Sequence, residues 1–259
     1  MMGSSPAENV LFGVVCLDVY TQTGQIRPGC GILHNAYHLQ RLGAEPLLIT
    51  RIGDRRHTVF LDFFAAHDLT VLPDSLIKPG RSASIHIVVQ PTGEAVISGF
   101  DLGVWADFQL TAAEATWLTG ASNIHTVLVQ GFLDDFLQAG RNGYLSNAFV
   151  SADFLSFRNF TLDSFAELLP YLDLGFLGWK GDRTDPILAE IKRAVRQHPI
   201  LFVITLGDRG IIVFDAREPG NFQEQFFPVE KVAVQGNTNG CGDAFIAYFI
   251  AEYWRTRNL

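Results

Sequence analysis

The sequence predicts an α/β protein built on a mostly parallel, doubly wound sheet with helices on both faces. Short apolar runs alternate along the chain with segments whose apolar residues recur at helical spacing. The first unit is a strand expected over 9–16, which stops before Asp18, followed by a helix expected over 31–42 that ends at Gly43. In such a fold, ligands bind at the carboxyl ends of the strands.

The same alternation continues through the chain. A strand at 46–50 precedes a helix at 59–67, and TAAE at Thr111 is typical of a capping box that opens a helix. The remaining elements are expected as strands at 126–130, 147–151, 174–177, 201–205, 211–214 and 222–227, with helices after 134, from 162 and at 186–197. Two runs at 84–89 and 94–98 flank the turn signal PTG and interrupt the rhythm as an antiparallel hairpin.

Length and composition favour one folded domain over 1–259 that binds a small molecule. The chain has 259 residues, 48% of them apolar and 18% charged, which one core can accommodate. Its net charge of -8, without a basic stripe, argues against a nucleic-acid or acidic-membrane partner. Cys16, Cys30 and Cys241 lack the spacing of a metal site or a disulfide framework, and the polar N-terminus lacks the features of a leader. A cytoplasmic protein is therefore expected.

The segment Asn239 to Asp243 combines glycines with an acid where a loop becomes a helix. Free backbone amides at a helix start attract anions, and glycines at 240 and 242 let a phosphate approach the backbone. Asp243 would repel that phosphate unless it faces an acceptor hydroxyl, whose proton it could take. The alternative is that Asp243 only interacts favourably with the helix dipole.

Two further segments carry ligand-binding side chains. Thr205 ends a strand before a tight turn between Gly207 and Gly210, where nucleotide phosphates or ribose could bind; taken alone, the pattern is more typical of an ordinary β-turn. Asp18 and Asn35 could hydrogen-bond the hydroxyls of a polyol. The alternative is that these two residues only end a strand and begin a helix.

Together, the three segments resemble the ribokinase-like (PfkB) carbohydrate kinases over nearly the whole chain. N-T-N-G-C-G-D-A-F at 237–245 resembles the family motif D-T-x-G-A-G-D-[AS]-F, which implies that Asp243 is the catalytic base and that Gly240, Cys241 and Gly242 form the anion hole. P-G-C-G-I-L-H-N-A at 28–36 resembles GG-x-x-x-N-x-A, and 205–210 resembles T-L-G-x-x-G. The segments around 16–20 and 103–111 look most like the fructoselysine 6-kinase branch.

The resemblance implies ATP, magnesium and transfer of the γ-phosphoryl group to a primary hydroxyl of a sugar or sugar derivative. A small β lid is expected over 19–28 and 82–101, through which two chains could form a homodimer. The implied site residues are, for the substrate, Asp18, Gly31, Asn35, Tyr20 and Trp105, and, for the nucleotide, Thr205, Gly207, Gly210 and Asn237.

Several positions depart from the family pattern. Asn237 stands where the motif usually has aspartate, and Cys30 stands at one of the paired glycines, both expected to be mild changes. The usual N-x-x-E segment is replaced by residues around Trp179, among which Asp182 is the candidate outer-shell partner of magnesium. Only 16 residues follow Asp243, which predicts a nucleotide pocket open on one side or closed by a partner chain. These departures motivate the alternative of a sugar- or nucleotide-binding module that kept the kinase fold without phosphoryl transfer.

Overall fold

The computed structural model describes residues 7–73, 76–157, 160–232 and 237–256. Its centre is a nine-stranded sheet. In spatial order the strands are β15 (Gln223–Phe227), β14 (Ile211–Asp215), β13 (Leu201–Thr205), β12 (Leu174–Gly178), β11 (Phe149–Asp153), β10 (Asn123–Val127), β1 (Asn9–Phe12), β4 (Leu47–Ile49) and β6 (Thr70–Val71). Neighbouring strands are parallel except in two pairs at one edge, β13 with β14 and β14 with β15, which are antiparallel. The α/β prediction with a mostly parallel sheet is confirmed.

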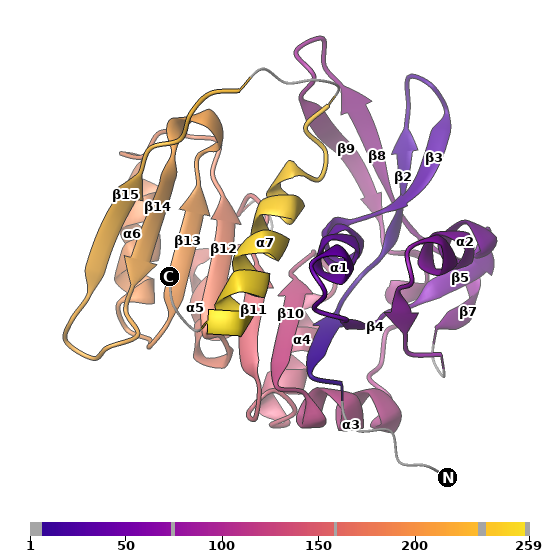
Figure 1. Ribbon diagram of the computed structural model, residues 1–259, viewed down its shortest axis with the longest axis horizontal. Helices are drawn as coiled ribbons and strands as arrows, with labels where there is room; N and C mark the ends of the chain where they lie inside the picture. Colours follow the sequence, from indigo (N-terminus) through magenta and orange to yellow (C-terminus); the bar gives the residue numbers. More distant parts are fainter. Residues whose placement is uncertain (1–6, 74–75, 158–159, 233–236, 257–259) are drawn as a thin grey trace.

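Helices cover both faces of this sheet (Figure 1). The helices α1 and α7 pack against each other on the face toward the viewer, whereas α4, α5 and α6 lie on the far face. The α-helices of the described residues are α1 (Gly31–Arg41), α2 (Thr58–Ala66), α3 (Ala112–Gly120), α4 (Leu133–Arg141), α5 (Leu162–Leu168), α6 (Pro186–Val195) and α7 (Cys241–Thr256), with 3₁₀ turns η1 (Gly103–Trp105), η2 (Leu169–Tyr171) and η3 (Gly207–Arg209). None of the described residues forms a helix long and apolar enough to cross a membrane.

A second, four-stranded sheet, called the small sheet below, stands over the carboxyl edge of the large one (Figure 1). Its strands, in spatial order, are β3 (Gln25–Gly29), β2 (Cys16–Tyr20), β8 (Ala83–Val89) and β9 (Ala95–Asp101). A separate two-stranded sheet joins β5 (Ile52–Arg55) to β7 (Ile77–Arg81). The expected hairpin at 84–89 and 94–98 is the β8–β9 pair.

Local sequence signals account for several boundaries. The capping box that opens α3 is present, since the Thr111 hydroxyl accepts from the Glu114 amide at 3.2 Å and the Glu114 carboxylate accepts from the Thr111 amide at 2.7 Å. β10 begins at Asn123, three residues before the strand expected at 126–130. The polar start of β10 stays buried because its side chains are bonded: His125 Nδ1 lies 2.9 Å from Ser151 Oγ.

The first predicted strand is wrong in one respect. The run expected over 9–16 is not one strand of the large sheet, because β1 ends at Phe12 and the chain then crosses to the small sheet at Cys16. Val14 and Val15 are buried within the crossing, so the apolar run stays continuous in sequence while the backbone changes sheets. Asp18 therefore belongs to the small sheet.

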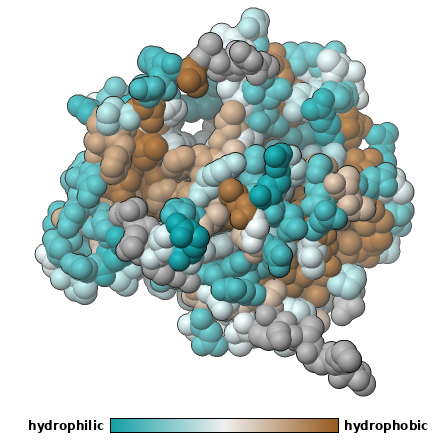
Figure 2. Space-filling view, in the orientation of Figure 1, coloured by the Kyte–Doolittle hydropathy of each residue, from teal (hydrophilic) through white to brown (hydrophobic). Residues whose placement is uncertain are grey.

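On the face toward the viewer, apolar side chains gather over β13 to β15 (Figure 2). None of the described helices covers the sheet there (Figure 1). Phe226 and Phe227 of β15 are 42% and 46% exposed. This uncovered face adjoins the end of β13, where the nucleotide site is expected.

Candidate active site

A cavity of about 540 Å³ opens between the carboxyl edge of the large sheet, the first turns of α1 and α7, and strand β9 of the small sheet. Residues at or just after the carboxyl ends of β10, β11, β12 and β13 form its floor. This volume and this place at the strand ends are typical of a small-molecule site in an α/β fold. The lining residues that matter below are Gly31, His34, Asp153, Thr205, Lys180, Asn239, Gly240, Gly242 and Asp243.

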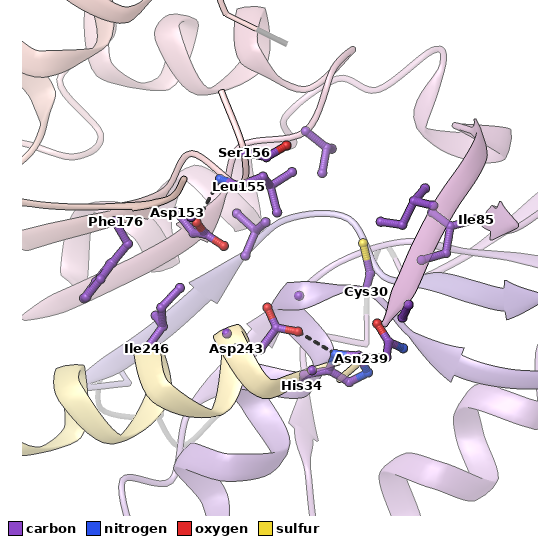
Figure 3. A pocket seen from close by; sticks show the side chains of 18 of the residues that line it. Cys30, His34, Ile85, Asp153, Leu155, Ser156, Phe176, Asn239, Asp243 and Ile246 are labelled. Carbon is purple, nitrogen blue, oxygen red and sulfur yellow. Dashed lines mark hydrogen bonds and ion pairs between the residues drawn. The ribbon is translucent and has the colours of Figure 1, made fainter. Parts of the chain in front are cut away.

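Asp243 lies on the cavity wall, in the first turn of α7 (Figure 3). A turn centred on Gly240, whose φ is 80°, starts the helix, and the left-handed conformation suits glycine. Among the described residues, no acceptor bonds the amides of Gly240, Gly242 and Asp243. These amides, at the positive end of the helix dipole, can bind an anion.

Cys241 differs from its predicted role. Its amide donates to the Thr238 carbonyl at 3.2 Å, and the residue is exposed without lining the cavity. Its backbone is therefore already bonded, and the free amides come from the residues on either side. The predicted anion cradle is thus centred on Gly240 and Gly242, without Cys241.

His34, in the first turns of α1, is the closest polar neighbour of Asp243. Its Nδ1 lies 2.7 Å from Asp243 Oδ2, and the two side chains are only 23% and 16% exposed (Figure 3). Burial lowers the pKa of His34, but the hydrogen bond and charge of Asp243, with the charge of Asp18, outweigh burial and raise that pKa above its usual value. His34 therefore carries positive charge beside Asp243 more readily than a free histidine does.

A second carboxyl group, that of Asp153 at the end of β11, also lines the cavity. Burial, reinforced by the charge of Asp243, raises the pKa of Asp153 to about 7, against a bond donated by the Leu155 amide at 2.8 Å. No lysine or arginine of the described residues pairs with Asp153. A cation bound in the cavity would supply the missing counter-charge.

On the side of the small sheet, three polar residues form a chain of contacts. Asn239 donates to Asp18 Oδ2 at 3.0 Å and lies 3.3 Å from the Tyr20 hydroxyl. Asp18 is 2% exposed, and burial raises its pKa, against the charge of His34. Asn239, which lines the cavity, stands between Asp18 and the cavity. Tyr20 and Asn237 instead line a separate cavity of about 280 Å³.

Asn35, predicted to bind a substrate hydroxyl, is fully buried behind the cavity wall. Its Nδ2 lies 2.9 Å from His125 Nε2, and it does not line the cavity. His34 and Asn35 are neighbours in one turn of α1. A step of one position along a helix rotates the side chain by about 100°, so His34 faces the cavity and Asn35 faces the core. Counting GG-x-x-x-N-x-A from Gly29 places the motif's asparagine at His34, a signal that the sequence already carried.

Trp105 is also a core residue, contrary to its prediction as a substrate contact. It is 1% exposed, its indole donates to the Arg51 carbonyl at 3.0 Å, and its ring stacks on Phe108 with centroids 4.7 Å apart. An indole sequesters its large apolar surface from water when its N–H finds a partner, as it does here. Trp105 does not line the cavity.

The predicted nucleotide residues separate into two groups. Thr205 lies on the cavity wall at the end of β13. Gly207 and Gly210, with φ of 63° and 118°, shape the following turn and do not line the cavity. Gly210 packs closely under Phe226, where an added Cβ would come within 2.7 Å of that ring, so the turn needs glycine for steric reasons.

Asp182 is also placed differently from its prediction. Its carboxylate accepts from the Thr184 amide at 2.9 Å and from the Thr184 hydroxyl, away from the cavity wall. No group of three or more His, Cys, Asp or Glu in the described part of the chain could hold a metal. Lys180, by contrast, lines the cavity and pairs with Glu94 in the β8–β9 turn. That turn also contacts the loop before α7, since Gly93 accepts from the Thr238 amide at 3.0 Å.

Cys30 sits at φ 78° and ψ 149°, immediately before α1. Only glycine adopts this region without strain. The replacement of glycine by Cys30 is therefore not the mild change that was expected, because the backbone there keeps the glycine conformation.

Comparisons with known proteins found similar sequences and similar structures. No model of a protein family matches the chain. The chain is 26% identical to fructoselysine 6-kinase of Escherichia coli over 238 residues, which cover 92% of this chain and 86% of that protein. Among solved structures it is similar to adenosine kinase of Anopheles gambiae, with a TM-score of 0.78 and 15% identity over 97% and 91% of the two chains. Ribokinase of Giardia lamblia gives a TM-score of 0.73 and 14% identity over 94% and 82%.

The resemblance to the ribokinase-like (PfkB) carbohydrate kinases is confirmed. Structure and sequence support it independently, because the structural likeness at this low identity shows the fold, whereas the sequence likeness covers most of both chains. The sequence likeness indicates a carbohydrate kinase.

Proposed function

We propose that this ribokinase-like chain transfers the γ-phosphoryl group of ATP to a primary hydroxyl of a sugar or sugar derivative, of the fructosamine or ketohexose type. One observation carries the proposal: a carboxylate, Asp243, shares a cavity at the strand ends with the unbonded amides of Gly240 and Gly242. A phosphoryl transfer needs both an anion site and a base beside the acceptor hydroxyl.

In the proposed step, Asp243 takes the proton of the acceptor hydroxyl while that oxygen bonds the γ-phosphorus. The bond from the γ-phosphorus to the bridging oxygen breaks, and ADP leaves. The free amides of Gly240, Gly242 and Asp243 stabilise the negative charge that collects on the transferred group. Thr205 and Lys180 also line the cavity, which supports a proposed role in contacting the nucleotide.

Magnesium fits this site through Asp153. Mg²⁺ usually binds one or two carboxylates together with substrate phosphates and water, so a cluster of three protein ligands is not required. Asp153 is a buried carboxyl group on the cavity wall, and burial and the charge of Asp243 raise its pKa. When bound, the ion would neutralise phosphate charge, and Asp153 would hold it in place of the predicted Asp182.

The small sheet is proposed as a lid over the acceptor. Its strand β9 lines the cavity, and its β8–β9 turn is tied to the large sheet by Lys180 and to the α7 loop by Thr238. Ile97 and Phe100 of β9 both line the cavity and are still 53% and 38% exposed, so they leave an apolar lid face that the second lid of the proposed homodimer would cover. Sedimentation of the wild type and of Ile97→Glu tests this pairing, since the charged variant should be monomeric.

An ATP-turnover assay over a panel of fructosamines, ketohexoses and nucleosides tests the proposed function. We expect phosphorylation of at least one fructosamine or ketohexose, and we expect Asp243→Asn to lower turnover by about 10²- to 10⁴-fold while acceptor binding persists. Calorimetric binding of a sugar without any phosphorylation would instead support the non-catalytic module. Unchanged turnover in Asp243→Asn would remove Asp243 from the mechanism.

A further inference from the structure

The contact between His34 and Asp243 lies inside the cavity and has no counterpart in the motif that the sequence resembles, where asparagine stands at this position. His34 Nδ1 and Asp243 Oδ2 are 2.7 Å apart, and they come from the two helices, α1 and α7, that pack against each other. A carboxylate can only accept in this bond, so Nδ1 carries the proton.

The ring of His34 also lies next to the turn at Gly240. A Cβ added to Gly240 would come within 3.4 Å of His34 Nδ1, so the imidazole lies against the turn that presents the free amides. His34 thereby bonds the base and lies beside the anion cradle.

The other oxygen of Asp243 lies beside Gly31. A Cβ added to Gly31 would lie 2.9 Å from Asp243 Oδ1, which shows that this oxygen occupies the space that a side chain at 31 would fill. One oxygen is thus engaged by His34 and the other passes over a glycine on the cavity wall. The carboxylate is restrained in rotation, with Oδ1 left to accept a proton.

We propose that His34 is a positioning residue, which fixes Asp243 through the Nδ1–H···Oδ2 bond so that Oδ1 faces the acceptor hydroxyl. The inference rests on the proposed function, in which Asp243 is the base. A restrained base reacts faster because less rotational freedom is lost at the transition state. His34 also adds charge to a site that otherwise contains several carboxylates.

The charges that face His34 set the pH range of this effect. Asp243 of α7 and Asp18 of β2 favour its protonated form, and His38, one turn along α1, interacts with it as a like charge. The bond weakens as pH rises through the pKa of His34, because a neutral imidazole holds a carboxylate less strongly than an imidazolium does. We therefore expect kcat to fall in that range, above the usual 6.5 of histidine.

The test uses the full chain with three variants, His34→Ala, His34→Asn and the control His38→Asn, which lies on the same helix outside the cavity lining. We expect His34→Ala to lower kcat by about 10- to 100-fold with KM for ATP within about twofold. His34→Asn keeps an N–H donor and should recover most of kcat, but should lose the falling limb of the pH profile. His38→Asn should behave as the wild type.

Two results would overturn the inference: kcat of a folded His34→Ala within about twofold of wild type, or superimposable pH profiles of the wild type and His34→Asn. If His34→Ala does not fold, the comparison with His34→Asn still decides. The proposed function fails separately, when Asp243→Asn keeps full turnover. Loss of turnover in Asp243→Asn together with a fully active His34→Ala would reject only the role of His34.

Discussion

Replacing Gly31 by alanine probes the geometry around the base directly. The new methyl would lie 2.9 Å from Asp243 Oδ1 and 3.2 and 3.3 Å from the two methyl groups of Val127, whereas ordinary contact begins near 3.4 Å. Val127 ends the buried strand β10 and is 2% exposed, so it cannot move away. The carboxylate must yield by about half an ångström. A misplacement of about 1 Å can cost about 10²-fold in rate, so we expect kcat to fall about tenfold.

Gly31→Ala should stay folded in the assay, because its expected loss of stability is small beside the roughly 5–15 kcal/mol that stabilises a typical domain. Alanine gains about 1 kcal/mol over glycine in a helix, and overpacking costs about 1–3 kcal/mol, which leaves a net loss of at most about 2 kcal/mol. The assay is kcat at saturating ATP and acceptor, with urea unfolding of the same protein.

Gly13→Ala is the matched control, because its new methyl would meet its neighbours at 3.7 Å, an ordinary contact, outside the cavity. Its kcat should equal that of the wild type. A Gly31→Ala variant with wild-type kcat would show that the position of Oδ1 does not limit the reaction, and would refute the reasoning.

Three further predictions concern residues around the cavity. Cys30→Gly should raise the free energy of unfolding by about 1 kcal/mol, because glycine adopts the strained backbone without cost; a loss of stability in urea would contradict this. Asp153→Asn should be more stable than the wild type by a difference that grows as pH rises from about 4 to about 7. The reason is that the wild-type carboxyl, with a folded pKa of about 7 against 3.8, resists ionisation in the folded state. Stability curves of the two proteins that stay parallel over this range would show that ionising Asp153 does not destabilise the folded state. Trp105→Phe should lower the free energy of unfolding by about 2–3 kcal/mol, because the Arg51 carbonyl loses its donor and the ring is smaller, with KM for the acceptor unchanged. A raised KM at unchanged stability would show that Trp105 contacts the substrate after all.

The elements of the fold follow from local signals, and so does the place of the base. The alternation of strands and helices, the capping box at Thr111 and the hairpin around PTG are short-range patterns, and each is present in the structure. Asp243 follows a glycine turn at a helix start, which also depends only on neighbouring residues. These features were predictable because their causes lie within a few positions of one another.

The partners of the base were not predictable in the same way. Asp243 and His34 are 209 positions apart, and only the packing of α7 on α1 brings them within 2.7 Å. Asp153 is an ordinary strand-end aspartate in sequence, and its raised pKa arises from burial beside Asp243. Asn35 and Trp105 have side chains that could bind a ligand. The direction of each side chain, however, depends on the rotation of α1 for Asn35 and on packing in the core for Trp105.

By itself, therefore, the sequence determined the α/β architecture, the glycine-lined helix start and the acid within it, since backbone conformation and hydrophobic periodicity are local properties. Only the tertiary structure decided which side chains surround that acid, which amides stay unbonded and which polar residues are buried instead of facing a ligand. Those outcomes depend on contacts between helices and sheets that are distant in the chain. A shift of one position along a helix is enough to turn a side chain from the cavity wall into the core.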